Sequence, residues 1–179
     1  MRIIFVRHGE TREGKRDIIL GSLNGHLTNE GKEEARELAQ ELKNNNILPD
    51  VIVTSPLKRA LDTATILSKK LNVGVLENAL IQERNAGIAE GKKESEIDWK
   101  IYKQKPIERR AHKGGETFLQ VQKRAQKFIR QIQKNKRNKN ILVVSHDVFI
   151  LMCIAIIKNK SIAYILKNRP RKKIIQIQI

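Results

Sequence analysis

Near its beginning the chain reads Phe5-Val6-Arg7-His8-Gly9-Glu10-Thr11, an apolar run that stops at an arginine, a histidine and a glycine. The β-branched and aromatic residues from Arg2 to Val6 are typical of a strand, and Gly9 lets the backbone turn sharply at the strand's end. Ligands of α/β proteins bind at the carboxyl ends of the strands, so Arg7 and His8 are candidate site residues. The alternative is an ordinary strand and loop with a solvated arginine and histidine.

Two later apolar runs end in the same way. Residues 51–54 lead into a helical pattern that carries Arg59 in its first turn, and residues 141–145 end at His146. If the three runs are parallel strands of one sheet, His8, Arg59 and His146 converge at its carboxyl edge from three distant parts of the sequence. Such convergence favours a functional site over surface decoration.

The rest of the pattern alternates strands with helices, which predicts an α/β fold: a three-layer sandwich with a mostly parallel central sheet flanked by helices. Thr28 is the expected N-cap of the first helix, and Asp147 is a candidate cap for a later one. Helices are expected over residues 29–44, 57–71, 97–102, 116–134 and 148–158, and further strands over residues 73–76 and 174–179.

A chain of 179 residues suits one domain over residues 1–179, and no internal repeat changes that interpretation. The irregular region from about 78 to 115 is the natural place for a lid or a substrate-selecting insertion. No apolar segment is long enough to span a bilayer and no signal-peptide pattern is present, so we expect no membrane association and a cytoplasmic protein. The single cysteine, Cys153, lies in an apolar helical pattern and is expected to be a small buried residue.

The formal net charge of +17 implies attraction to anions. Part of the excess lies in two basic runs, Lys134 to Lys139 and Lys167 to Lys173. Neither run contains an aromatic residue that could stack on a base, so specific nucleic-acid binding is not expected. A small phosphorylated metabolite is the expected partner. The apolar C-terminal strand could also pair with the edge of a second copy, which leaves a homodimer open.

Two imidazoles and two guanidiniums at one sheet edge make a site suited to phosphoryl transfer. Guanidiniums bind phosphate oxygens in bidentate fashion and stay charged. Nearby positive charge lowers the pKa of a histidine and leaves a ring nitrogen free to attack, so His8 is the expected nucleophile. Arg7, Arg59 and His146 would stabilise the charge on the transferred group. No Cys/His or carboxylate cluster with zinc spacing accompanies them, so no metal or cofactor is expected.

The leaving oxygen needs a proton donor, and Glu83 in the irregular region is our candidate for that acid. Beside arginines its pKa should fall in the free protein, whereas a bound phosphate dianion should raise it again. The alternative is a surface glutamate without a catalytic role. His26 and His112 are expected to be loop histidines, because no motif includes them.

Several ordered motifs resemble those of the histidine phosphatase superfamily, also called phosphoglycerate mutase-like, and the resemblance spans nearly the whole chain. Motifs in a fixed order are more specific than any one of them. They are Arg7-His8-Gly9-Glu10-Thr11; Gly21, Leu27, Thr28 and Gly31; Ser55-Pro56-Leu57-Lys58-Arg59-Ala60 with Thr63-Ala64; Leu80, Glu83, Gly87, Glu90 and Gly91; Gly114-Gly115-Glu116-Thr117; and Ser145-His146.

The resemblance implies a phosphohistidine on His8, a phosphate pocket of Arg7, Arg59 and His146, Glu83 as proton donor, and no metal. Four positions depart from the family pattern: Gly14 stands where an asparagine often contacts the phosphate, Asp147 replaces a common glycine, and Asn24 and His26 replace an aspartate and a proline. Asp147 could cap its helix or weaken the phosphate pocket by repulsion.

The leading hypothesis is a metal-independent phosphatase that hydrolyses small phosphomonoesters. One alternative is a cofactor-dependent phosphoglycerate mutase, although such mutases of this family are typically longer. By the same resemblance, a ribazole phosphate, a sugar phosphate, a nucleotide or a phosphoamino acid could be the substrate. A different class of hypothesis is a weakly catalytic module that binds polyanions through its basic surface.

Overall fold

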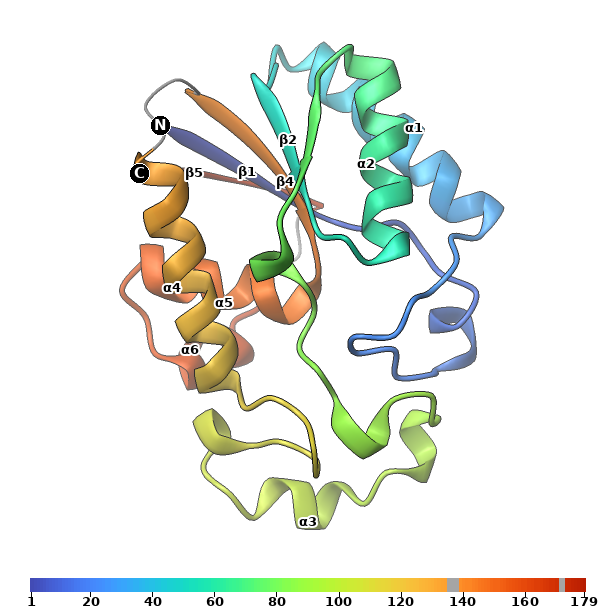
Figure 1. Ribbon diagram of the computed structural model, residues 1–179, viewed down its shortest axis with the longest axis vertical. Helices are drawn as coiled ribbons and strands as arrows, with labels where there is room; N and C mark the ends of the chain where they lie inside the picture. The colour runs from blue at the N-terminus through green and yellow to red at the C-terminus, as the bar shows by residue number, and fades with distance from the viewer. Residues whose placement is uncertain (135–138, 171–172) are drawn as a thin grey trace.

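The computed structural model describes residues 1–134, 139–170 and 173–179. In this part of the chain five strands form one sheet in the order β3-β2-β4-β1-β5 (Figure 1). Four strands run parallel, and β5 pairs antiparallel with β1 at one edge. The mostly parallel sheet predicted from the sequence is therefore confirmed. The strands are β1 (Arg2–Arg7), β2 (Val51–Thr54), β3 (Val75–Glu77), β4 (Asn140–Ser145) and β5 (Ile174–Gln178).

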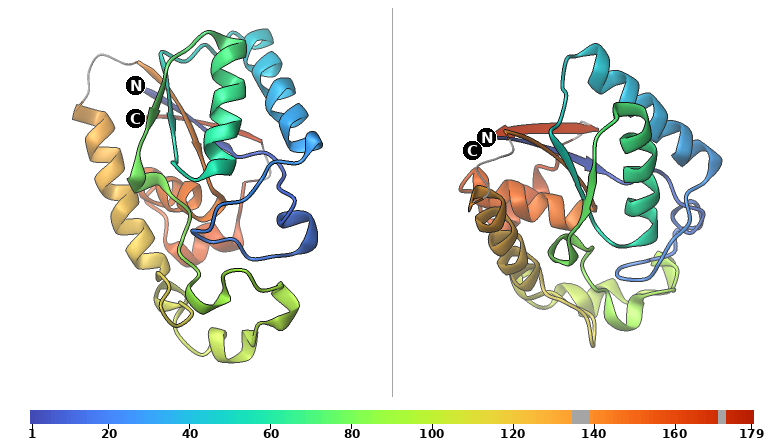
Figure 2. Two further views of the ribbon diagram at one scale, coloured as in Figure 1. Left: turned by 45° about the vertical axis from the view of Figure 1, so that its right-hand side comes forward. Right: turned by 45° about the horizontal axis from the view of Figure 1, so that its top comes forward.

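Helices cover both faces of the sheet, which makes the predicted three-layer sandwich (Figure 2). One layer consists of α1 (Asn29–Asn44) and α2 (Lys58–Leu71), which pack against each other. On the opposite face α4 (Phe118–Lys134) packs against α5 (Asp147–Ile157), and α5 packs against α6 (Ile162–Lys167). The sequence patterns predicted four of these helices; α6, which begins after the capping hydroxyl of Ser161, was not predicted.

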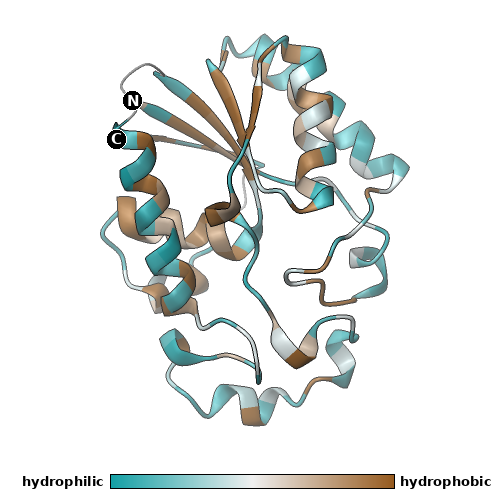
Figure 3. Ribbon diagram, in the orientation of Figure 1, coloured by the Kyte–Doolittle hydropathy of each residue, from teal (hydrophilic) through white to brown (hydrophobic). Residues whose placement is uncertain are grey.

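The sheet separates two hydrophobic cores because successive strand residues point to opposite faces. In β1, Ile3 and Phe5 join the core under α4 and α5, whereas Ile4 and Val6 join the core under α1 and α2. The interiors of the three central strands, β2, β4 and β1, are accordingly continuous apolar runs, while α4 carries its apolar residues on one side (Figure 3). Such continuous apolar strands are expected for a sheet that is covered on both faces.

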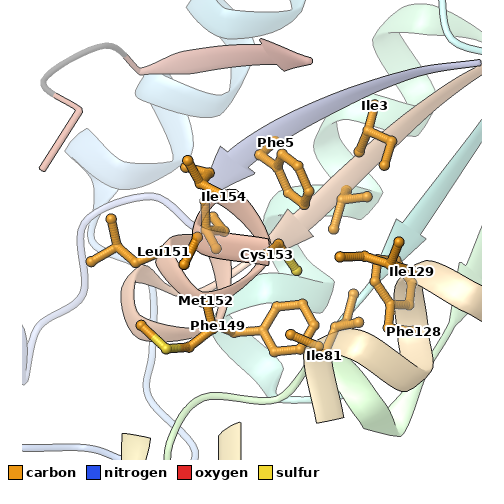
Figure 4. Packing of buried hydrophobic residues seen from close by; sticks show 14 of the residues in the cluster. Ile3, Phe5, Ile81, Phe128, Ile129, Phe149, Leu151, Met152, Cys153 and Ile154 are labelled. Carbon is orange, nitrogen blue, oxygen red and sulfur yellow. The ribbon is translucent and has the colours of Figure 1, made fainter. Parts of the chain in front are cut away.

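The helix α5 is nearly all apolar because it is buried between the sheet and α4. Figure 4 shows its residue Phe149 close to Ile81, Phe128 and Ile129. The rings of Phe128 and Phe149 meet edge to face, with their centroids 5.8 Å apart. Cys153 lies in the same core and is fully buried, as the sequence predicted. This packing fixes the start of α5, which follows His146 directly.

Most expected element boundaries are met to within one or two residues, and two of the differences have a visible cause. The strand expected from residue 73 begins instead at Val75, because Asn72 ends α2 in the left-handed conformation and Val73 is still bonded to the helix through Ser68. Asp147 is the first residue of α5 and not its cap, since His146 occupies the N-cap position, and the His146 side chain makes no capping hydrogen bond. Thr28 does cap α1, accepting a hydrogen bond from the Gly31 amide at 2.9 Å.

The region from 78 to 115 lies beyond the carboxyl ends of the strands (Figure 1). It holds one short α-helix, α3 (Trp99–Lys103), close to the helix expected there. Single 3₁₀ turns make up most of its other ordered structure: Ala79–Ile81, Gly87–Ala89, Glu94–Glu96 and Ile107–Arg109; a further turn, Gly14–Arg16, lies in the loop after β1.

The two chain ends lie side by side at the edge strand (Figure 1). The Met1 amine and the Ile179 carbonyl are 2.9 Å apart, and the Ile179 amide donates to the Met1 carbonyl. No helix among the described residues has the length and apolarity needed to cross a membrane. Of the two basic runs, residues 135–138 and 171–172 lie outside the described residues.

Candidate active site

The ends of β1, β2 and β4 are hydrogen-bonded to one another, and this brings three of the predicted site residues together. The His8 amide donates to the Ser145 carbonyl at 3.1 Å, and the Ser55 amide donates to the Val144 carbonyl at 3.1 Å. His8 and His146 follow directly after their strands, and their ring centroids are 5.1 Å apart. Arg59 reaches the same point from the first turn of α2.

Two contacts fix the tautomer of His8. Its Nδ1 lies 2.8 Å from the Gly9 carbonyl oxygen, which can only accept a hydrogen bond, so we assign the ring proton to Nδ1. The other nitrogen, Nε2, accepts a hydrogen bond from Nε of Arg59 at 3.1 Å. Burial, together with the charge of Arg59 and Arg7, lowers the pKa of His8 to about 3. The imidazole is therefore neutral at physiological pH and keeps a lone pair on Nε2.

Arg59 is held rigidly although it is one of the most buried side chains, with 1% of its surface exposed. Its Nη1 donates to the Leu23 carbonyl at 2.6 Å and its Nη2 donates to the Gly21 carbonyl at 2.8 Å. The guanidinium thus ties the loop after β1 to α2 and presents Nε to His8. Asn24 adds a second tie, because its side chain accepts a hydrogen bond from the Lys58 amide at the start of α2.

His146 is fully buried, and one of its two ring nitrogens has no hydrogen-bond partner in the part of the chain that the structure describes. Its Nε2 lies 2.8 Å from the Ser55 hydroxyl, whereas its Nδ1 has no hydrogen-bond partner among the described residues. Burial, followed by the charge of Arg59, holds the pKa of His146 well below the usual histidine value. A buried polar atom without a partner is rare in folded proteins, so Nδ1 of His146 stands out as an atom that a bound group could satisfy.

Arg7 is the last residue of β1 and is exposed, so its charge is accessible from outside. A hollow of about 560 Å³ reaches His8, and Arg7, Lys15 and Asp147 are among the side chains that line it. Gly14, at the position where the family often has an asparagine, also lines this hollow but offers no side chain.

Glu83 lies in the loop after the turn Ala79–Ile81, at the same edge of the sheet. Its carboxylate accepts a hydrogen bond from the Arg84 amide at 2.7 Å and a longer one from the Val148 amide at 3.5 Å. Burial and the nearby charge of Asp147 raise its pKa, although Arg59 acts in the opposite direction. The expected net fall of this pKa in the free protein is therefore wrong: Arg59 does lower it, but desolvation outweighs that effect.

Asp147 forms an ion pair on the rim of the site. Its Oδ2 lies 2.6 Å from Nη1 of Arg169, and this pairing offsets the repulsion that an aspartate would exert on a phosphate. The carboxylate also sits in the first turn of α5, where the helix dipole favours negative charge.

The other two histidines lie in loops, as expected. His26 is exposed and its Nδ1 is 3.1 Å from a carboxylate oxygen of Glu13. His112 stacks on the ring of Tyr102 with a centroid distance of 4.6 Å. Neither histidine contacts His8 or His146. No three His, Cys, Asp or Glu side chains of residues 1–134, 139–170 and 173–179 gather in an arrangement that could hold a metal ion.

Sequence reasoning assigned no role to two side chains that shape the site. The Ser55 hydroxyl contacts His146, and Arg124 of α4 contacts the backbone of the loop that carries Glu83. A signal for Arg124 is present in the sequence: it stands between Val121 and Phe128 on the apolar face of its helix, where a charge needs buried partners.

Comparisons with known proteins agree with this architecture. Phosphoserine phosphatase 1 of Hydrogenobacter thermophilus is 31% identical over 154 residues, which span 83% of this chain and 72% of that protein. The 2,3-bisphosphoglycerate-dependent phosphoglycerate mutase of Buchnera aphidicola subsp. Cinara cedri is 38% identical over 99 residues, which span 54% of this chain and only 43% of the mutase. The alpha-ribazole phosphatase from Shigella flexneri has the same fold, with a TM-score of 0.88 over 100% of this chain and 91% of that chain, at 24% identity.

The model of one family matches almost the whole chain. It is that of the histidine phosphatase superfamily (branch 1), and the match runs from residue 3 to residue 171. This range contains every motif on which the resemblance rested. The chain therefore belongs to the histidine phosphatase superfamily.

Proposed function

We propose that the protein is a phosphatase that hydrolyses small phosphomonoesters through a phosphohistidine on His8. The observation that carries the proposal is the state of the His8 ring: Nδ1 donates to the Gly9 carbonyl, and the unprotonated Nε2 faces Nε of Arg59 beside the His146 ring. A neutral imidazole beside fixed positive charge is a competent nucleophile for a phosphoryl group.

In the first step, Nε of Arg59 would exchange its hydrogen bond to Nε2 of His8 for one to a phosphoryl oxygen. The freed lone pair of Nε2 then forms a bond with phosphorus while the ester P–O bond breaks. Arg7 and Arg59 would hold the phosphoryl oxygens. His146 would donate from Nδ1: the Ser55 hydroxyl accepts from the Leu57 amide at 3.2 Å, so its own hydrogen is available for Nε2 of His146, which leaves the ring proton on Nδ1. Glu83 would give its proton to the leaving oxygen, because its raised pKa favours the protonated form.

The second step returns the protein to its starting state. Glu83, now ionised, takes a proton from a water molecule, and the water oxygen forms a bond with phosphorus as the N–P bond to His8 breaks. Inorganic phosphate leaves, with Glu83 protonated and Nε2 of His8 free again. In this scheme the guanidiniums and His146 supply the charge stabilisation that a metal ion supplies in other phosphatases.

A phosphatase is preferred to a mutase because of how the relatives align. The phosphatase match covers 154 residues of that protein, whereas the mutase match covers 99 residues and less than half of the mutase. We also propose that residues 78–115 form part of a single domain and select the substrate, since they lie beyond the strand ends (Figure 1). The basic composition, with a net charge of +17, suits a small anionic substrate.

The test is hydrolysis of p-nitrophenyl phosphate in the presence of a metal chelator, with the His8→Ala variant and a His26→Ala control. His26 is exposed and outside the site, so its loss should leave the rate unchanged. Activity that survives the chelator, is retained in His26→Ala and is absent from His8→Ala supports the proposal. Trapping of acid-labile phosphate on the wild-type protein, absent from His8→Ala, would identify the intermediate. Equal activity in the wild-type and His8→Ala proteins overturns it.

A further inference from the structure

The loop that carries Glu83 is gripped by one side chain of the neighbouring helix. Nη1 of Arg124 donates to the carbonyls of Leu80 at 2.7 Å and of Gln82 at 3.0 Å, and Nη2 donates to the carbonyl of Glu83 itself at 3.2 Å. Three backbone carbonyls within four residues thus converge on one guanidinium. Only an arginine has donors in a planar fork that can serve so many acceptors at once.

Arg124 is in turn fixed by a carboxylate. Its Nε and Nη2 donate to the two oxygens of Glu116 at 2.9 Å and 2.8 Å, a bidentate ion pair. The guanidinium carbon also lies 5.6 Å from the ring centre of Phe149. The side chains of Arg124 and Glu116 are 19% and 26% exposed, so the pair is partly shielded from water. A guanidinium with this many partners has little freedom to move.

Glu116 holds the loop on the far side of Glu83. One carboxylate oxygen accepts a hydrogen bond from the Asn85 amide at 3.0 Å, and the Glu116 amide donates to the Asn85 carbonyl at 2.9 Å. The pair therefore contacts the backbone both before and after the acid. On the N-terminal side of Glu83, the Ser145 hydroxyl at the end of β4 also donates a hydrogen bond to the Ile81 carbonyl, at 2.7 Å.

We infer that Arg124, which Glu116 holds in place, is a positioning residue that keeps the carboxyl group of Glu83 in the position needed to act on a group bound at His8. The inference rests on the proposed phosphatase function, because it concerns the acid of that reaction. Arg124 does not contact the reacting atoms: its bonds to the site go to backbone carbonyls and reach the chemistry only through Glu83. Misplacement of a catalytic group by about 1 Å can cost about 100-fold in rate.

Loss of acid positioning leaves a specific kinetic signature. A phosphomonoester with an alkyl leaving group needs a proton on the departing oxygen, whereas p-nitrophenolate leaves without one. The ratio kcat/KM reports the step in which the leaving group departs. A displaced Glu83 should therefore lower kcat/KM for an alkyl phosphate much more than for p-nitrophenyl phosphate, whereas a general loss of folded protein lowers both alike.

The experiment compares Arg124→Gln, Arg124→Lys and the control Arg130→Gln, an exposed arginine of the same helix. Each is assayed for kcat/KM with phosphoserine, an alkyl phosphate, and with p-nitrophenyl phosphate, at a temperature where thermal unfolding shows all proteins to be folded. Should wild type not use phosphoserine, glycerol 2-phosphate is the alkyl substrate. The Glu83→Gln variant gives the pattern expected for full loss of the acid.

We expect Arg124→Gln to lose about 100-fold with the alkyl phosphate and far less with p-nitrophenyl phosphate, as Glu83→Gln does. Arg124→Lys keeps the charge but not the fork and should lie between wild type and Arg124→Gln. In the double variant with Glu83→Gln, the Arg124 change should have little further effect on either substrate. The Arg130→Gln control should match wild type.

Equal losses with both substrates, or a wild-type rate in Arg124→Gln, overturn the inference while the proposed phosphatase stands. A wild-type protein whose hydrolysis does not depend on His8 instead overturns the proposed function itself. Assay of His8→Ala with the same two substrates therefore distinguishes the two failures.

Discussion

Nε of Arg59 donates a hydrogen bond to Nε2 of His8 at 3.1 Å across 51 positions of sequence. The other two nitrogens of the same guanidinium donate hydrogen bonds to the carbonyls of Leu23 and Gly21. One buried cation therefore adds to the effect of burial in lowering the pKa of His8, orients its ring and holds the loop after β1. The residues that Arg59 contacts are far from it in the sequence, so these three effects arise only in the folded chain.

The first prediction concerns Arg59→Lys. An ammonium on a flexible stem cannot reproduce three donors in one plane, so at least one carbonyl and Nε2 of His8 lose their partner. We expect kcat for p-nitrophenyl phosphate to fall by about 100- to 1,000-fold, the range typical for loss of one fixed charge-stabilising donor. Each unpartnered buried carbonyl should also cost about 1–3 kcal/mol of stability.

The matched control for Arg59→Lys is Arg36→Lys, which changes an exposed arginine paired with Glu33 on the surface of α1. Surface pairs of this kind contribute about 0–1 kcal/mol, so this variant should keep both activity and stability. Steady-state kinetics and chemical denaturation measure the two effects. An active, fully stable Arg59→Lys variant would contradict the role assigned to the guanidinium.

The second prediction is a pH dependence of stability that originates from His8. Its pKa is lowered from 6.5 to about 3 in the folded protein, mainly by burial, so between these values the unfolded chain binds a proton that the folded chain does not. Stability must then fall as the pH is lowered from 6.5 toward 3, by up to about 1.4 kcal/mol per pH unit. Above pH 6.5 this contribution is constant.

The variant His8→Gln removes that titrating group and keeps a polar side chain. Its free energy of unfolding should fall less than that of wild type between pH 6.5 and 4.5. His146, whose pKa is also lowered by burial, contributes in the same direction but is present in both proteins. Chemical denaturation at several pH values measures the difference, and parallel losses in the two proteins would show that the His8 pKa is not lowered.

The third prediction concerns the alkaline limit of activity. The pKa of Glu83 is raised by burial and by the negative charge of Asp147, and the acid works only while protonated. Asp147→Asn removes the charge and should lower that pKa, so the alkaline limb of the pH profile of kcat/KM for an alkyl phosphate should move to lower pH. Asp62→Asn, which removes a carboxylate paired with Lys58 on α2, should leave the limb in place. A shift to higher pH in Asp147→Asn would contradict the prediction.

The sequence predicted the convergence of His8, Arg59 and His146 because parallel strands place their carboxyl ends at one edge by geometry alone. Three strand patterns were enough, and no packing detail was needed. An alternation of polar and apolar residues was not needed to recognise these three strands, because strands that are covered on both faces form continuous apolar runs. The layers and the mostly parallel sheet therefore followed from local patterns and general topology, whereas the strand order β3-β2-β4-β1-β5 was not predicted.

Effects that depend on burial could not be obtained in the same way. The rise in the pKa of Glu83 results from desolvation in a loop whose path no local pattern describes. The late start of β3 depends on Ser68, which holds Val73 to the end of α2. Arg124 could be suspected from its apolar helix face, but its carbonyl partners lie more than 40 positions away.

The last prediction tests the contact that seats the His8 loop on α1. A Cβ atom added at Gly9 would lie 2.3 Å from the carbonyl oxygen of Gly31, a backbone atom of the first turn of α1 that cannot rotate away. Gly9→Ala must therefore push the loop and the helix apart. This displaces the Gly9 amide from the Thr63 hydroxyl, its partner at 3.1 Å, and the Gly9 carbonyl from Nδ1 of His8.

We expect Gly9→Ala to lose about 1–3 kcal/mol of stability, as overpacked sites do, and to lose activity even where it is folded. Gly74→Ala is the matched control, because a Cβ there meets nothing within 4 Å. That variant should keep its activity. Its free energy of unfolding should be no lower than that of wild type and up to about 0.4–1 kcal/mol higher, because alanine reduces the conformational entropy of the unfolded chain. Thermal unfolding followed by assay of the folded proteins measures both, and a Gly9→Ala protein as stable as Gly74→Ala would mean that the loop does not pack on the helix backbone.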